Sequence, residues 1–204
     1  MDNQHRPVDV IEILQGASLL VPEAQAGADD LTVSDVWEHL SDDAWDVAVA
    51  LLEELGGAPP LPPSFWQELA TAAGQLHLPR SAAWCRWRAD EAVHGIVRAD
   101  LTLAPEGESR RRTPLPGAGV LRPMWRIGHR TPQGEPVLDI AALWVESVPF
   151  LEPGGRATVR LAPLVPPRWR HLRPGQVITL HEDNSTAGTA VVLDVRPPQE
   201  PAAT

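Results

Sequence analysis

The stretch IVRADLTL, residues 96–103, marks the point at which the pattern of the chain changes. Apolar and polar side chains alternate through it, as expected of a half-buried β-strand. The residues before it repeat with the period of a helix, and those after it form short alternating runs separated by turn residues. The chain therefore divides near Gly95 into a helical half and a strand-rich half.

Five more alternating runs follow this first one, and no helical pattern lies between them. Clusters of Gly, Pro, Asn and Asp, such as TPQGEP and EDNSTAG, separate the runs. Six short strands over about 100 residues predict a small closed barrel or a sandwich, and closure would remove exposed strand edges. The later runs are VLRPMWRI (120–127), LDIAALWVE (138–146), ATVRLAP (157–163), QVITLHE (176–182) and TAVVLDV (189–195).

Capping residues divide the helical half into four predicted helices. Each begins with a serine, the residue type that binds the free amides of a helix start. Five of the eight tryptophans lie here at helical spacing with aliphatic residues, so we expect them to form the core of a small helical bundle. The predicted starts are Ser34, Ser41 with Asp42 and Asp43, Ser64 with Gln67, and Ser81; the predicted ends include Gly56–Gly57 and Gly95.

The charge of the chain is concentrated at one end. Residues 1–79 hold 14 acidic residues and one arginine, whereas residues 80–204 hold 13 acidic residues and 16 arginines. The formal net charge of −10 therefore arises from the helical half, which we expect to present an acidic outer face or an acidic surface for a protein partner. Lysine is absent, and the abundance of Arg, Ala, Pro and Gly is typical of a GC-rich bacterial genome.

The composition also limits the environment of the protein. No apolar run approaches the length of about 20 residues that spans a bilayer, and the first residues do not resemble a signal peptide, so we expect a soluble, cytoplasmic protein without membrane contact. Cys85 is the single cysteine, which excludes an intramolecular disulfide and a multi-cysteine zinc site. Its apolar neighbourhood predicts a buried, unreactive thiol.

Together these patterns predict an α+β protein with four parts. Residues 1–30 form an N-terminal segment, strand or helix, that docks on one of the halves. Residues 31–95 form the acidic helical domain, residues 96–196 the β domain, and residues 197–204 a disordered tail.

The order of motifs in residues 96–196 resembles the C-terminal barrel, domain III, of bacterial elongation factor Tu. The strand ADLTL leads into Ser109–Pro114, which includes Thr113 and matches a Gly-Gly-Arg-His-Thr-Pro loop of that family. Further matches follow in the same order: Leu121–Trp125, with Arg122 and Pro123, Leu151–Gly155, with Pro153 and Gly154, and His181–Gly188. The resemblance implies a six-stranded antiparallel β-barrel, with Thr113, Pro114, Arg122, Pro123, Trp125, Pro153, Gly154 and Gly188 as its structural motif residues.

The departures from that family bear on function. Elongation factor Tu binds GTP through a separate domain with a Gly-rich phosphate loop, and this chain has neither a G-x-x-x-x-G-K-[ST] segment nor any lysine. Domain III of the family contacts its GTPase domain, aminoacyl-tRNA and elongation factor Ts. Here Asp183 and Asn184 replace a glycine pair, and Ser185 replaces an arginine, which argues against tRNA binding.

No motif for catalysis is present. The seven histidines show no H-E-x-x-H or similar metal spacing, and no G-x-S-x-G elbow follows a strand. We therefore expect no enzyme activity, no metal, no nucleotide and no cofactor.

The candidate partner-binding residues are two groups of basic and aromatic side chains. We expect the arginine triplet to lie in an exposed loop and Arg122 to be fixed by the fold, because only Arg122 belongs to a motif of the family. Arginine forks bind carboxylates and phosphates, and tryptophan stacks on bases or guanidinium groups. The candidates are Arg110, Arg111, Arg112, Arg126, Arg168, Trp169 and Arg170.

Besides a regulated or structural protein whose acidic helical half self-associates or covers the basic face of the barrel, two functions are compatible with these residues. The first is a non-catalytic protein-interaction module that presents a barrel like that of elongation factor Tu, as a decoy, immunity or regulatory protein linked to translation. The second is binding of tRNA or another RNA through Arg111, Arg112, Arg122 and Arg126. The acidic helical half would repel a polyanion, which favours a protein partner from the translation machinery.

Overall fold

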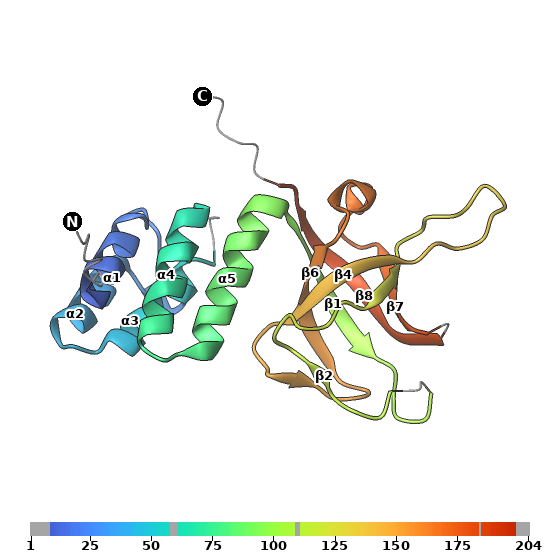
Figure 1. Ribbon diagram of the computed structural model, residues 1–204, viewed down its shortest axis with the longest axis horizontal. Coiled ribbons are helices and arrows are strands. Elements are labelled where there is room, and N and C mark those ends of the chain that lie inside the picture. The colour runs from blue at the N-terminus through green and yellow to red at the C-terminus, as the bar shows by residue number, and fades with distance from the viewer. Residues whose placement is uncertain (1–8, 58–60, 109–110, 184, 199–204) are drawn as a thin grey trace, which may run out of the picture. The chain divides into compact units, whose positions relative to one another are not determined.

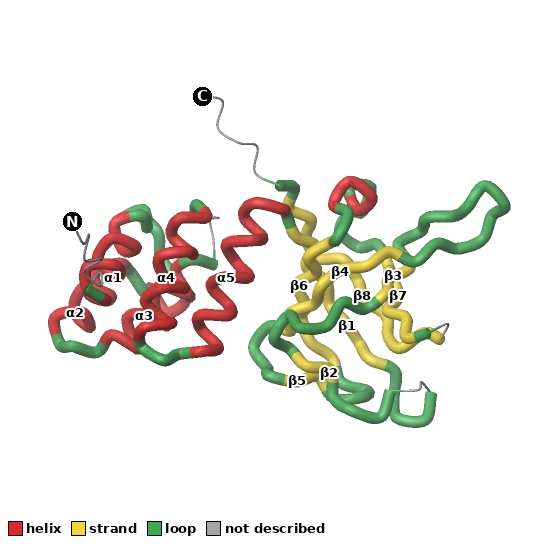
Figure 2. Tube along the Cα trace, viewed as in Figure 1, coloured by secondary structure: helices red, strands yellow, loops and turns green. Residues whose placement is uncertain are grey.

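The computed structural model describes residues 9–57, 61–108, 111–183 and 185–198, and divides the chain into two compact units, residues 1–92 and 93–204 (Figure 1). The first unit is helical and the second is a β-barrel, so the α+β class and the order of the two halves are as predicted (Figure 2).

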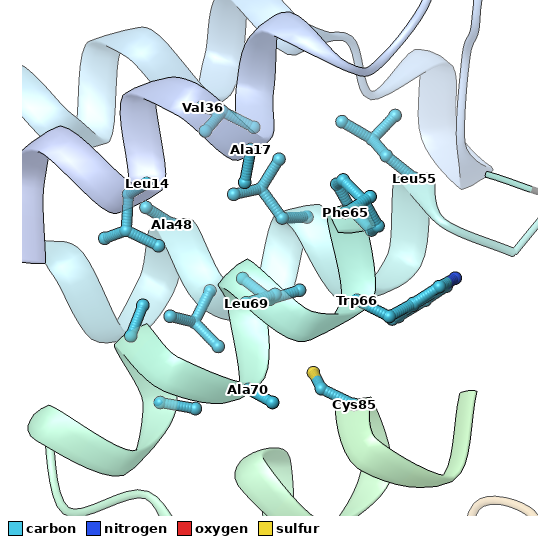
Figure 3. Packing of buried hydrophobic residues seen from close by; sticks show 14 of the residues in the cluster. Leu14, Ala17, Val36, Ala48, Leu55, Phe65, Trp66, Leu69, Ala70 and Cys85 are labelled. Carbon is cyan, nitrogen blue, oxygen red and sulfur yellow. The ribbon is translucent and has the colours of Figure 1, made fainter. Parts of the chain in front are cut away.

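Five α-helices build the first unit. Their buried faces carry Leu14, Leu52 and Leu69, which are fully buried in one apolar cluster (Figure 3). The N-terminal segment forms a helix that belongs to this cluster and packs mainly against α4, so residues 10–19 are part of the helical unit. The helices are α1 (Val10–Leu19), α2 (Val33–Ser41), α3 (Trp45–Leu55), α4 (Pro63–Gln75) and α5 (Pro79–His94), with a 3-10 turn η1 (Ala28–Asp30).

The helix starts differ from the predicted serine caps. The cap of α2 is Thr32, whose side chain and that of Asp35 form a capping box, and not Ser34. The cap of α3 is Ala44, because Ser41 still belongs to α2 and its hydroxyl donates to the Trp37 carbonyl at 2.9 Å. Proline supplies the first position of α4 and of α5, so neither Ser64 nor Ser81 begins a helix.

Arg88 of α5 is buried among the aromatic residues of the helical unit. Its guanidinium lies 4.2 Å from the centroid of the Trp66 ring, and its Nη2 donates to the Gly56 carbonyl at 3.0 Å. The guanidinium also pairs with Glu91 at 3.1 Å. Arg88 therefore links α5 to the C-terminal end of α3 through polar and cation–π contacts.

Cys85 is fully buried, as predicted, in the apolar cluster of Figure 3. Its Sγ lies 3.6 Å from a carboxylate oxygen of Glu53. Burial, and after it the Glu53 carboxylate, raises the pKa of Cys85 well above its ordinary value. The thiolate is disfavoured at neutral pH, and a nucleophilic role for Cys85 has no support here.

Six antiparallel strands close into the barrel of the second unit, in the order β1-β6-β4-β3-β7-β8. The sheet closes because β1 pairs with both β6 and β8, for example Val97 with Leu161 and Leu101 with Ala190. Two short strands, β2 and β5, form a separate pair. The bounds are β1 (Ile96–Leu103), β2 (Leu115–Pro116), β3 (Met124–Arg126), β4 (Asp139–Val145), β5 (Phe150–Leu151), β6 (Arg156–Pro163), β7 (Val177–Glu182) and β8 (Ser185–Arg196), with a 3-10 helix η2 (Pro166–Trp169) between β6 and β7.

Each predicted alternating run overlaps one of the six barrel strands, although β8 extends beyond its run at both ends. The run at 120–127 shortens to β3, although the carbonyls of Leu121 and Pro123 still accept bonds from Leu143 and Ala141. Pro123 has no amide hydrogen to donate, so regular pairing begins only after it. The predicted disordered tail falls mainly on residues 199–204, outside the described residues.

An ion network joins three strands or strand ends of the barrel. The Glu146 carboxylate accepts from Arg98 of β1 at 2.9 Å and from Arg160 of β6 at 2.7 Å. Burial alone would raise the pKa of Glu146, but the hydrogen bonds from Arg98 and Arg160 outweigh it and hold that pKa below its ordinary value. The network therefore stabilises the barrel only while Glu146 is ionised.

We expect Glu146→Gln to lower the free energy of unfolding of the barrel by about 2–3 kcal/mol at pH 7, since it removes charge-assisted bonds from two arginines. Because the folded-state pKa lies below the unfolded value of about 4.3, the contribution of Glu146 is fully present above that pH. It is lost as the pH falls through the folded-state pKa. Urea unfolding between pH 3 and 7 should thus show a smaller loss of stability at low pH in the variant than in the wild type.

Glu152→Gln is the control, because Glu152 is exposed and its side chain has no hydrogen-bond partner among the described residues. An unchanged pH profile in Glu146→Gln would contradict the role of this network.

Candidate functional site

The arginine triplet is mostly paired within the fold. Arg111 is half-buried; it binds the Glu182 carboxylate at the end of β7 and donates through Nη1 to the carbonyl of Thr113 at 3.2 Å. Arg112 lies 4.0 Å from Glu106, both side chains being exposed. Arg110 lies outside the described residues. The triplet was expected in an exposed loop, but Arg111 links the segment before β2 to the end of β7.

Arg122 and Arg126 have the opposite placement. Both are exposed, and neither guanidinium has a hydrogen bond to a described residue. Arg122 was expected to be fixed by the fold and Arg111 to be exposed. The structure shows the reverse: Arg111 is paired, and Arg122 is exposed. Arg126 pairs with Thr179 of β7. Burial, and after it the charge of Arg126, lowers the pKa of His181.

The other motif residues have structural positions. Trp125 is fully buried in the barrel core, and Pro114, Pro123 and Pro153 are half-buried in turns or beside strands. Gly154 has a φ of 76°, which favours glycine in its turn. A side chain at Gly188 would meet the Thr102 carbonyl oxygen at 2.9 Å, so this glycine permits the close pairing of β1 and β8.

Arg168, Trp169 and Arg170 belong to η2 or follow it directly, and they have three different environments. Arg168 pairs with the buried carboxylate of Asp139 at the start of β4. Trp169 is 2% exposed and forms part of the barrel core, so its ring does not present a free face for a base. Arg170 is exposed, and no described residue pairs with its guanidinium.

No sequence pattern predicted the polar cluster that holds η2 in place. His129 Nδ1 lies 2.9 Å from Asp139 Oδ2, and the His129 and His171 rings lie 4.7 Å apart. The His171 ring also bridges the carbonyls of Ile127, at 2.7 Å, and Arg168, at 3.0 Å. Burial alone would raise the pKa of Asp139, but hydrogen bonds from Arg168 and His129 outweigh it and keep that pKa low. A charged Asp139 therefore holds η2 against β4.

Neither histidine of this cluster is bonded to a hydroxyl or thiol in the described part of the chain. The described residues also contain no group of three or more His, Cys, Asp or Glu side chains suited to a metal. The role that these contacts support for the polar cluster is structural: it holds η2 against β4.

A pocket of about 650 Å³ lies next to this fastened segment, at the end of the barrel where β1 begins and β6 and β8 end. Its walls are mostly apolar and rich in proline, with arginines among them. The volume of the pocket and its mostly apolar walls are typical of sites that bind part of a ligand or of a protein partner. All lining residues belong to the second unit: His94, Gly95, Ile96, Val97, Pro163, Pro166, Trp169, Arg170, Leu172, Arg173, Pro174, Asp194, Val195, Arg196, Pro197 and Pro198.

Local sequence explains the shape of the pocket. Gly95 has a φ of 81°, and a side chain there would lie 2.6 Å from the carbonyl oxygen of Arg196, so glycine allows the start of β1 to pass close to the end of β8. Prolines end β6 and follow β8, which stops strand pairing and leaves the space open. Two predicted candidates, Trp169 and Arg170, line the pocket, whereas Arg111, Arg112 and Arg126 do not.

Comparison with known proteins does not assign the chain to a family. No protein-family model and no curated protein matches the chain. Among the described residues, no helix is both long enough and apolar enough to cross a bilayer.

Proposed function

We propose that this chain is a non-catalytic protein-interaction module that binds a partner polypeptide in the pocket at the end of its barrel. The observation that carries the proposal is the pocket itself, a mostly apolar cavity of about 650 Å³ with walls from three segments of the barrel unit, within residues 94–97, 163–174 and 194–198. Apolar concavities with a few polar groups are the usual form of a binding site.

The distribution of paired arginines supports a protein partner over RNA. An RNA groove needs a continuous row of free cations along the backbone. Here Arg111 is committed to Glu182 and Arg168 to Asp139, which interrupts both arginine groups. What is left is an apolar cavity with a basic rim, which suits a peptide better than a phosphate backbone.

The biological setting we propose follows from the sequence motifs. Residues 96–196 resemble domain III of elongation factor Tu, and a closed six-stranded antiparallel barrel is the fold that this resemblance implies. We propose accordingly that the partner belongs to the translation machinery or recognises elongation factor Tu, with the chain acting as a decoy, immunity or regulatory protein in the cytoplasm.

A photocrosslinking side chain, p-benzoylphenylalanine, tests the site. We expect it to form a protein adduct in the native cells when it replaces Pro174, which is exposed at the pocket. At Val120, an apolar residue of the same unit that is 68% exposed but away from the pocket, we expect no such adduct. The adduct should be destroyed by protease and be insensitive to nuclease.

A nuclease-sensitive adduct at Pro174 would favour the RNA function instead. Equal adducts at Pro174 and Val120, or none at Pro174, would contradict partner binding in the pocket.

A further inference from the structure

We infer that the partner segment bound in the pocket presents a carboxylate beside an apolar side chain, and that Arg173 binds this carboxylate. This inference rests on the proposed function and adds the chemistry of the partner.

The Arg173 guanidinium is already held in place. Its Nη1 donates to two backbone carbonyls, those of Arg170 and Leu172, each at 2.7 Å. Both carbonyls belong to the turn that follows η2, so the guanidinium is held against the turn that carries it. An arginine fixed in this way loses less conformational entropy on binding than a free one.

The opposite edge of the same guanidinium is unoccupied. Arginine has five N–H donors, and the two on Nη1 face the two carbonyls. No described residue accepts from Nε or Nη2 of Arg173. These two nitrogens form the edge that binds a carboxylate through two parallel hydrogen bonds.

The charges around the pocket also favour an anion. Arg196 pairs with Asp194 at 2.8 Å, so these two charges offset each other. Arg170 and Arg173 have no acidic partner among the described residues. The pocket therefore keeps two uncompensated positive charges, and an acidic group on the partner would complement them.

The apolar part of the pocket sets the second requirement. The accessible apolar surface comes from prolines that line the pocket: Pro166 is half-buried, and Pro174 and Pro197 are exposed. A fully polar anion such as phosphate would leave this surface unused, whereas an apolar residue next to a carboxylate would cover it. A C-terminal apolar residue of the partner carries this combination, and it is the occupant that we infer.

The test uses the full-length chain and ¹H–¹⁵N NMR spectra that include the arginine Nε–H signals. The probe is acetyl-Gly-Ser-Gly-Ile-Leu with a free C-terminal carboxylate. We expect its addition to shift the Nε–H signal of Arg173, assigned by its disappearance in Arg173→Lys, and the amide of Leu172. The C-terminal amide of the same peptide should bind at least about tenfold more weakly, because it cannot accept the charge-assisted pair of bonds.

Variants of Arg173 distinguish the contribution of the planar guanidinium from that of its positive charge. Arg173→Lys keeps the charge but lacks the planar fork, and Arg173→Gln lacks both, so we expect affinity to fall roughly fivefold and at least tenfold, respectively. Arg130→Gln is the matched control, since the Arg130 guanidinium is also bonded to a backbone carbonyl, that of Gly134 at 2.7 Å, but lies outside the pocket. We expect Arg130→Gln to bind the probe like the wild type.

A second peptide, acetyl-Gly-Ile-Glu-Gly-Ser-amide, identifies the kind of carboxylate. Tighter binding of the first peptide supports a chain end as the occupant, whereas tighter binding of this second peptide would contradict it in favour of an internal acidic residue. Equal binding of acid and amide, no shift at Arg173 with either peptide, or tighter binding of bulk tRNA at Arg173 would overturn the inference.

The two proposals fail separately. If the crosslink at residue 174 persists in Arg173→Gln, the pocket binds a protein by other contacts and only the carboxylate inference is wrong. If the peptide acid binds but no protein adduct forms in cells, the site has the inferred chemistry and the proposed function is wrong.

Discussion

Gly95→Ala is expected to lower the free energy of unfolding of the barrel unit by about 3 kcal/mol or more, and to close the binding pocket. Two costs add. A φ of 81° places an alanine in the left-handed region, which costs about 1 kcal/mol. The new Cβ would also lie 2.6 Å from the Arg196 carbonyl oxygen and 2.8 Å from the Pro198 nitrogen, both backbone atoms. Relief requires a backbone shift, which costs a further 1–3 kcal/mol or so.

Gly175→Ala separates these two costs. Gly175 has nearly the same φ, 85°, in the turn that leads to β7, but a side chain there meets nothing within 4 Å. We expect this variant to lose only about 1 kcal/mol. The difference between the two variants then measures the close approach of β1 and the end of β8.

Hydrogen exchange of the β1 and β8 amides during urea titration is the appropriate measurement, because it reports on the barrel and not on the helices. The same preparations should be titrated with the peptide acid: Gly95→Ala should lose binding, and Gly175→Ala should retain it. Equal losses of stability in the two variants would show that the overlap at Gly95 is relieved at no cost.

The barrel was predictable because its information is local in sequence. A strand with one face in a small core must alternate apolar and polar residues, and each of the six runs does so, as β1 with buried Ala99, Leu101 and Leu103 shows. The alternating runs alone left a closed barrel or a sandwich open, and the six-stranded barrel was what the resemblance to domain III implied.

The binding pocket could not be predicted in this way. It combines the start of β1 with the segment around Arg173 and the end of β8, both of which follow the start of β1 by more than half of the barrel sequence. Two signals were present, the prolines that interrupt pairing after β6 and β8 and the basic segment around Trp169, but neither shows that these segments meet. The start of β1 meets the end of β8 only through the register in which these two strands pair.

The placement of single arginines was equally beyond sequence patterns. Arg111 precedes β2 and Arg122 follows it, both between β1 and β3, and motif order favoured Arg122 as the fixed one. Arg111 is instead the paired residue because Glu182, at the far end of β7, lies beside it. A partner 71 positions away leaves no trace in a local pattern.

The end of α3 at Gly56 was predicted correctly, but the physical reason for glycine at this position differs from the predicted one. The pair Gly56–Gly57 was predicted to end a helix because glycine tolerates left-handed backbone, and α3 does end there. Yet Gly56 has a φ of −67°, which any residue adopts. It is required instead because an added Cβ would lie 2.3 Å from Cη2 of Trp66.

We therefore expect Gly56→Ala to destabilise the helical unit by about 3 kcal/mol or more. Trp66 is 1% exposed, and Arg88 lies over its ring, so the indole has no free space into which to move. Its displacement would also disturb the buried bond from Arg88 to the Gly56 carbonyl. Overpacking of a core costs about 1–3 kcal/mol, and loss of a buried bond to a charged group a further 1–3 kcal/mol or so.

Gly74→Ala should have the opposite sign. Gly74 lies within α4, and a side chain there meets nothing within 4 Å, so alanine should stabilise the helix by about 0.5–1 kcal/mol. Hydrogen exchange of the α3 and α4 amides would measure both changes. A double-mutant cycle with Trp66→Leu tests the cause: if the indole is the obstacle, Gly56→Ala should cost much less when residue 66 is smaller, whereas additive effects would place the obstacle elsewhere.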